Sequence, residues 1–101
     1  MKDWRVFITP AAERALKKLP QEVRQFVLEG FSEKIRANPF LGDQLSGPLA
    51  WLRSFHFSSK GKPYRVVYNV ESETSRVIIY YAGHRAEFYE RLRKHLREWK
   101  K

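Results

Sequence analysis

A run of aromatic and β-branched residues, Tyr64-Arg65-Val66-Val67-Tyr68-Asn69-Val70, lies in the second half of the chain. Successive side chains of a β-strand point to opposite faces, so Tyr64, Val66 and Tyr68 would share one face and Arg65 would lie on the other. An arginine between a tyrosine and a valine is costly to bury without a partner. We therefore predict a strand that presents one face to a core, with Arg65 either in solvent or lining a groove on the open face.

Two more β-like runs flank this strand. Trp51–Phe57 precedes it and Arg76–Ala82 follows it, and both are rich in aromatic and β-branched residues. The connecting segments are short enough for hairpins. In the first run, Arg53, Phe55 and Phe57 alternate with Ser54, His56 and Ser58.

The first forty residues carry a helical period instead. Trp4–Ile8 is a short β-like run, and Thr9-Pro10 is typical of a helix N-cap followed by proline at the first helical position. Apolar residues recur at helical spacing as far as Leu19 and again from Gln21 to about Asn38, on either side of Pro20. These patterns predict two antiparallel helices joined by a proline turn.

The tail from Arg85 is predicted to be helical as well, with its larger apolar residues on one side: Phe88, Leu92, Leu96 and Trp99. The element order is therefore β-α-α-β-β-β-α. We predict a single α+β domain over residues 1–101, with a helical hairpin packed on a mostly antiparallel four-stranded sheet.

Composition excludes several classes of protein. The 101 residues contain no cysteine, which excludes disulfide scaffolds, thiol catalysis and thiolate zinc sites. No apolar run approaches the roughly 20 residues of a membrane span, and the N-terminus does not resemble a signal peptide. We expect a cytoplasmic protein with no membrane partner.

The net charge of +9 is unevenly distributed. Residues 44–70 contain four basic residues and no acid, and residues 85–101 contain seven basic residues against three Glu. The first 43 residues carry eight bases and six acids and are close to neutral. A basic second half is typical of a surface that binds a polyanion, although a solvated surface that keeps a small protein soluble is the alternative.

Several short motifs at fixed spacing resemble the RelE/ParE superfamily of toxins from prokaryotic toxin–antitoxin modules. They are Gly47-Pro48-Leu49, Leu52-Arg53-Ser54-Phe55, Tyr64-Arg65-Val66-Val67-Tyr68, Gly83-His84-Arg85 and Phe88-Tyr89. The resemblance covers nearly the whole chain. It implies a RelE/ParE-like fold and one of two activities, which are ribosome-dependent mRNA cleavage and inhibition of DNA gyrase.

For the mRNA-cleaving branch, the resemblance assigns roles to three residues. Arg65 and Arg85 match the two arginines that hold the scissile phosphate, and Tyr89 matches a tyrosine thought to stack on a base or to transfer a proton. Arginine suits a phosphate because its planar group donates two hydrogen bonds at fixed geometry and keeps its charge. Such cleavage also needs a general base and a general acid.

The chain departs from the pattern where several members carry lysines, because Ser54 and His56 stand on that strand. We predict His56 as the general base or acid, since imidazole titrates near neutrality, with a strand residue of no catalytic role as the alternative. Arg53, Lys60 and Lys62 are predicted to bind RNA, and Lys60 and Lys62 are also the alternatives to His56 for the proton transfer. His84 is interpreted as structural.

These assignments favour a metal-independent endoribonuclease, for which we expect no cofactor and no metal. Its partners would be the ribosome, mRNA and a cognate antitoxin that is acidic and partly disordered, folding as it binds the basic surface. The alternatives are a non-enzymatic inhibitor of DNA gyrase and a nucleic-acid-binding member that has lost its activity.

Overall fold

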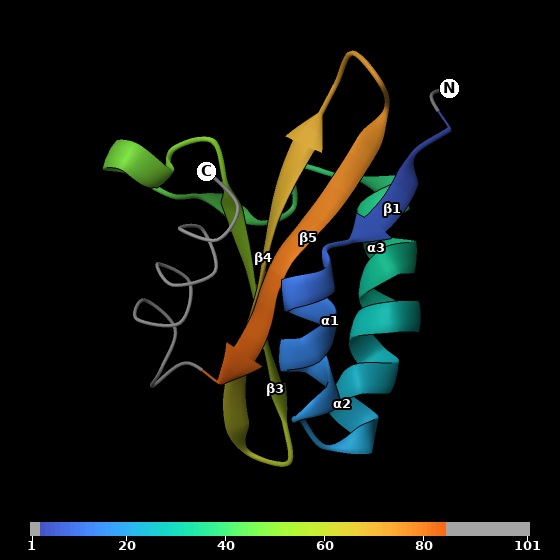
Figure 1. The fold of residues 1–101 in the computed structure, drawn as a ribbon, viewed down its shortest axis with the longest axis vertical. Helices are drawn as coiled ribbons and strands as arrows, with labels where there is room; N and C mark the ends of the chain where they lie inside the picture. The colour runs from blue at the N-terminus through green and yellow to red at the C-terminus, as the bar shows by residue number, and fades with distance from the viewer. Residues whose placement is uncertain (1–2, 85–101) are drawn as a thin grey trace.

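A computed structural model of the chain describes residues 3–84. The elements are, in chain order, β1 (Arg5–Ile8), α1 (Pro10–Lys17), α2 (Gln21–Gln25), a π-helical segment (Phe26–Phe31), α3 (Ser32–Ala37), β2 (Asp43–Gln44), a 3₁₀ helix (Gly47–Leu49), β3 (Arg53–Ser59), β4 (Lys62–Glu71) and β5 (Arg76–His84). The helices α1, α2 and α3 lie together on one side of the sheet (Figure 1). None of the described helices is long and apolar enough to cross a membrane. The predicted C-terminal helix lies outside the described residues.

Both predicted N-terminal helices are present. The Thr9 side chain accepts a hydrogen bond from the Ala12 N–H at 3.1 Å, and Pro10 follows as the first helical residue, so this N-cap prediction is confirmed. The second helical segment runs from residue 21 to residue 37 but passes through a π-helical turn in its middle. Around this turn, Phe26 contacts Phe57, with 4.5 Å between ring centroids, and Phe31 contacts Tyr68 at 5.5 Å.

Within residues 3–84, the sheet has five strands in the order β1-β5-β4-β3-β2, rather than the four predicted. β1 is parallel to β5, and the other neighbours are antiparallel. The additional strand is β2, in which Asp43 pairs with Ser54 and Gln44 pairs with Arg53. Two polar residues in a loop carry no β pattern, so only their pairing with β3 reveals this strand.

A tight turn sets the register of the first hairpin. Lys60 and Gly61 connect β3 to β4 with φ of 50° and 78°, as a type I′ turn requires at both central positions. Glycine adopts this conformation without strain, whereas lysine does so less often. With this turn, His56 is the register partner of Arg65.

The main core lies between the helices and the sheet. The helical residues are Ala12, Leu16, Val27, Phe31 and Ile35, and the strand residues include Val66, Tyr68, Val77 and Ile79. The Tyr68 hydroxyl donates to the Pro39 carbonyl at 2.9 Å and accepts from the Gly42 N–H at 2.8 Å, which fixes the loop after α3 to the core. Burial is the main cause that raises the pKa of Tyr68 above its ordinary value.

The opposite face of the sheet, here called the open face, carries a second apolar cluster. Its buried members are Leu52, Val67, Tyr80 and Tyr81. The Trp51 ring meets the Tyr80 ring edge-on, with 5.2 Å between centroids. Burial raises the pKa of Tyr80. The apolar cluster covers one part of the open face, and the polar residues His56 and Arg65 lie nearer to the β3–β4 turn.

A register shift in the β4–β5 pair determines which residues meet near Arg65. Val67 pairs with Tyr81 but Tyr68 pairs with Ile79, so Tyr80 is an extra residue in β5. Such a bulge bends the strand and changes the direction of the side chains that follow it. As a result, Gly83 becomes the register partner of Arg65.

Candidate functional site

The polar part of the open face is organised by one row of residues across three strands. His56 on β3 pairs with Arg65 on β4, and Arg65 pairs with Gly83 on β5. Side chains of directly paired residues in antiparallel strands lie on the same face, about 4.5–5.5 Å apart at Cβ. The sheet therefore brings His56 and Arg65 together, as the proposed shared chemistry requires.

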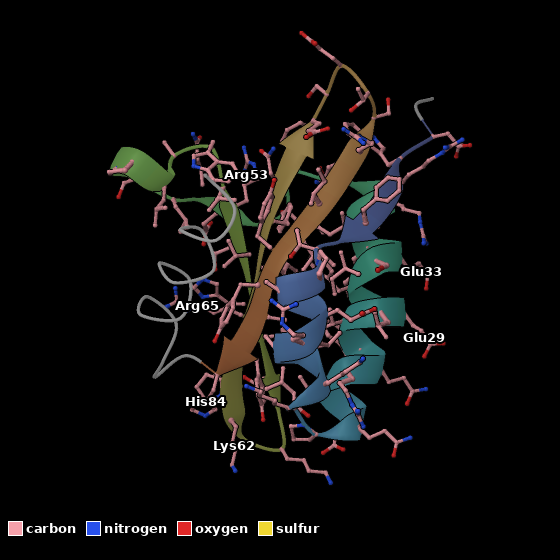
Figure 2. All side chains as sticks on the ribbon, in the orientation of Figure 1. Glu29, Glu33, Arg53, Lys62, Arg65 and His84 are labelled. Carbon is pink, nitrogen blue, oxygen red and sulfur yellow. The ribbon has the colours of Figure 1, made fainter. Side chains whose placement is uncertain are left out.

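Arg65 lies on the central strand of the described sheet and is half-buried. Figure 2 shows it on the side of the sheet away from Glu29 and Glu33, which lie on the helical side. A shallow pocket of about 170 Å³ adjoins it and is lined by His56, Phe57, Ser58, Pro63, Tyr64 and Arg65. A guanidinium keeps its charge even when half-buried, so this pocket has a fixed positive group at its wall.

Gly83 leaves room for the ring of Tyr81. A Cβ at this position would lie 2.7 Å from Cζ and 2.9 Å from Cε2 of Tyr81 and would overlap its hydroxyl oxygen. The Tyr81 ring therefore occupies the place of a side chain at Gly83. Sequence reasoning did not assign these two residues, although an isolated glycine in a strand-like run indicates a bulge or a close approach.

His84 lies at the end of β5, next to this row. It pairs with Tyr64, and the two rings meet edge-on with centroids 5.5 Å apart. Because Tyr64 belongs to the helix-facing side of β4, His84 lies on the other face of the sheet from Arg65. This ring contact agrees with the structural role predicted for His84.

The two predicted loop lysines lie at the same end of the sheet. Lys62 begins β4 and, with His84, lies where β5 ends (Figure 2). Lys60 Nζ is 3.2 Å from Glu22 Oε1, and both side chains are exposed. A backbone hydrogen bond and then Lys60 lower the pKa of Glu22. An exposed ion pair of this kind contributes little to stability, so Lys60 can exchange Glu22 for a phosphate at small cost.

Arg53 is placed apart from this group. Its guanidinium donates to the Gly42 carbonyl at 2.7 Å and to the Phe40 carbonyl at 3.4 Å, and lies 5.0 Å from the centre of the Phe40 ring. These contacts hold the loop before β2 against the sheet. RNA binding by Arg53 stays a prediction, and the structure does not bring it to Arg65.

Arg85 and Tyr89 lie outside the described residues, so their predicted roles rest on the resemblance alone. In the sequence, Arg85 directly follows His84, the last residue of β5. Within residues 3–84, no group of three or more His, Asp or Glu side chains is placed to hold a metal ion.

Comparison with known proteins agrees with this architecture. Residues 6–93 match the family described as the ParE-like toxin of the type II bacterial toxin-antitoxin system. Toxin RelG from Mycobacterium tuberculosis (strain ATCC 25618 / H37Rv) is 33% identical over 87 residues, which are 85% of this chain and 95% of that protein.

Solved structures show the same fold. The toxin-antitoxin complex RelBE2 from Mycobacterium tuberculosis contains a chain that is 30% identical, with a TM-score of 0.69 over 83% of this chain and 100% of that one. A mutant of the E. coli toxin RelE in the free state is 20% identical, with a TM-score of 0.74 over 96% of this chain and 98% of that one. The chain belongs to the ParE-like toxin family of type II bacterial toxin-antitoxin systems, within the RelE/ParE superfamily.

Proposed function

We propose that this toxin is a ribosome-dependent endoribonuclease that cleaves mRNA and thereby inhibits translation. The observation that carries the proposal is the position of Arg65, which is half-buried on the central strand beside a small pocket, with His56 as its register partner. A guanidinium can donate two parallel hydrogen bonds to the oxygens of one phosphate. An imidazole next to it can exchange a proton near neutral pH.

The proposed reaction is a transfer within the RNA strand. The 2′-oxygen attacks the adjacent phosphorus while its proton passes to a base, and the bond from phosphorus to the 5′-oxygen breaks as that oxygen receives a proton. The products are a 2′,3′-cyclic phosphate and a 5′-hydroxyl. Arg65 would stabilise the negative charge that grows on the phosphorane, and His56 would perform one of the two proton transfers.

The family resemblance supplies two further residues for the same step. Arg85 would be the second cation on the phosphate, and Tyr89 would stack on a base or transfer a proton. Lys60 and Lys62, at the same end of the sheet as the Arg65 row, would hold the RNA backbone without taking part in the chemistry.

The ribosome would supply the positioning that a small domain cannot. Holding the reacting groups in attack geometry can lower the activation barrier by about 7–11 kcal/mol. Ribosomal RNA would provide the scaffold that holds the substrate in this geometry. The net charge of +9 favours contact with ribosomal RNA, which is a polyanion. A ribosomal target places the protein in the bacterial cytoplasm.

A cognate antitoxin would keep the toxin inactive in the cell. The similar RelBE2 chain was solved in a toxin-antitoxin complex, which supports this partner. Charge complementarity favours an acidic segment that folds as it binds. Expression of the toxin alone should stop growth, and co-expression of the antitoxin should restore it. Normal growth of cells that contain soluble toxin alone would contradict the assignment.

The experiment that tests the activity is primer extension on an mRNA in a translating extract. We expect new ends aligned with codons when the parent protein is added, and far fewer with Arg65→Ala. A DNA gyrase supercoiling assay is run in parallel. Inhibition of gyrase without new mRNA ends would replace this proposal with the gyrase alternative, and neither effect would indicate a member without activity.

A further inference from the structure

A groove between α1 and the end of β5 lies next to the Arg65 row and was not assigned from the sequence. Its volume is about 250 Å³, and it is lined by Ala15, Lys18, Leu19, Tyr81, Ala82, Gly83 and His84. This volume is below the roughly 300–1,000 Å³ of pockets for drug-sized ligands, so it suits a single group such as one base or one sugar. We call it the α1–β5 groove.

The α1–β5 groove and the pocket beside Arg65 are lined by paired residues of β5 and β4. Tyr64 lines the Arg65 pocket and pairs with His84, which lines the groove. Arg65 likewise pairs with Gly83. Ala15 of α1 packs against the open-face cluster that contains Tyr81, so the groove adjoins the open face. An RNA strand held at Arg65 would reach the groove by crossing β5 at Gly83, which pairs with Arg65 and lines the groove.

The positive charge of the groove favours an anionic ligand. Among its described lining residues, Lys18 is the cation, and none is acidic. A larger groove of about 520 Å³ on the other side of α1 differs, because Glu13 and Glu29 line it together with Lys17 and Arg24. A polyanion is favoured in the first groove and is opposed by the two carboxylates in the second.

We propose that the α1–β5 groove binds the nucleotide adjacent to the scissile phosphate, with Lys18 on its phosphate and its sugar or base against Ala15, Leu19 and Ala82. Lys18 is exposed and belongs to the nearly neutral N-terminal half of the sequence, so only the fold brings it to the basic end of the sheet. Lysine binds phosphate as a point charge and does not need a fixed orientation. This inference rests on the proposed function, because it assumes that RNA is held at Arg65.

The test uses neighbouring lysines of the same helix end as a matched pair. Lys18 lines the α1–β5 groove and Lys17 lines the groove with both charges, so charge reversal at each changes the net charge equally. The probe is a fluorescein-labelled 2′-O-methyl hexanucleotide, which cannot be cut because its nucleophile is blocked. Binding to the purified full chain is followed by fluorescence anisotropy over a range of salt concentrations.

We expect Lys18→Ala to weaken binding about fivefold and to lower the salt slope by about 0.7, the loss of one phosphate contact on a single strand. Lys18→Glu should weaken binding further, Lys18→Arg should retain it, and Lys17→Glu should change it less than twofold. Equal losses for Lys17→Glu and Lys18→Glu would overturn the inference, because they would show an effect of net charge alone. Absence of binding by the parent protein would also overturn it.

The two proposals fail in different ways. Binding of the uncleavable hexanucleotide does not require cleavage. A selective loss at Lys18 in a protein that leaves mRNA intact would reject the proposed function and keep the groove as an RNA site. Cleavage of mRNA with equal losses at Lys17 and Lys18 would keep the function and reject the groove.

Discussion

Alanine at Gly83 is expected to weaken both folding and cleavage, because its Cβ would collide with the ring of Tyr81. The Cβ would lie 2.7 Å and 2.9 Å from two ring carbons, whereas carbon atoms in contact lie about 3.5–4.0 Å apart. Ring and Cβ must therefore separate by about 1 Å. Tyr81 is 2% exposed, so its ring cannot move outward without disturbing the open-face cluster. Overpacking of this kind costs about 1–3 kcal/mol of the free energy of unfolding.

The same displacement should reach the chemistry, because Gly83 is the register partner of Arg65. A shift of about 1 Å in a positioned group can lower a rate by about 10²-fold. Urea denaturation measures the loss of stability of Gly83→Ala, and single-turnover cleavage on programmed ribosomes measures the loss of rate.

A second substitution identifies the cause. Tyr81→Phe removes the hydroxyl that a Cβ at Gly83 would overlap. The double variant should lose less stability than the sum of the losses in the two single variants. The difference, which is the coupling free energy, should be at least about 0.5 kcal/mol. If Gly83→Ala unfolds at the parent's urea midpoint and cleaves at the parent's rate, the packing of Tyr81 over Gly83 is refuted.

Three further predictions concern the frame around the site. Tyr68→Phe should lower the free energy of unfolding by about 1–3 kcal/mol, because the buried Gly42 N–H and Pro39 carbonyl lose their partner; an unchanged urea midpoint would contradict this. Since the folded state raises the pKa of Tyr68, its contribution to stability is complete below the ordinary pKa of 10.0 and is lost as the pH rises through the folded-state value. Unfolding followed from about pH 9 to about pH 11 should therefore show a steeper fall in the parent than in Tyr68→Phe. Lys60→Ala should leave the urea midpoint unchanged, because its ion pair with Glu22 is exposed, and should weaken RNA binding; a large loss of stability would show that the pair is structural.

The sequence predicted the parts of the fold that depend on local pattern. The alternation in β4 correctly separated Tyr64, Val66 and Tyr68 from Arg65, because a two-residue period fixes which face each side chain takes. The cap at Thr9 was predictable for the same reason, since its hydrogen bond spans three residues.

Features that depend on pairing between distant segments were not predictable. β2 is a strand only through its pairing with β3. Tyr80 is an extra residue only because the β4–β5 pair changes register beside it. That change places Gly83 opposite Arg65, and the packing of α1 beside β5 brings Lys18 to the same end of the sheet. Charge counted along the chain could not find Lys18, because its own half of the sequence is nearly neutral.

Removal of the Arg65 guanidinium tests the central claim most directly, with Arg76→Ala as the matched control. Arg76 is an arginine at the other end of β5, where it pairs with Glu71 at 2.6 Å, far along the strand from Gly83. In single-turnover cleavage on programmed ribosomes, Arg65→Ala should cleave about 10²–10³-fold more slowly than the parent, as expected for the loss of one donor to a transition-state oxyanion. Arg76→Ala should cleave at nearly the parent's rate, and both variants should remain folded. Cleavage by Arg65→Ala at the parent's rate would contradict the role of Arg65 in holding the phosphate.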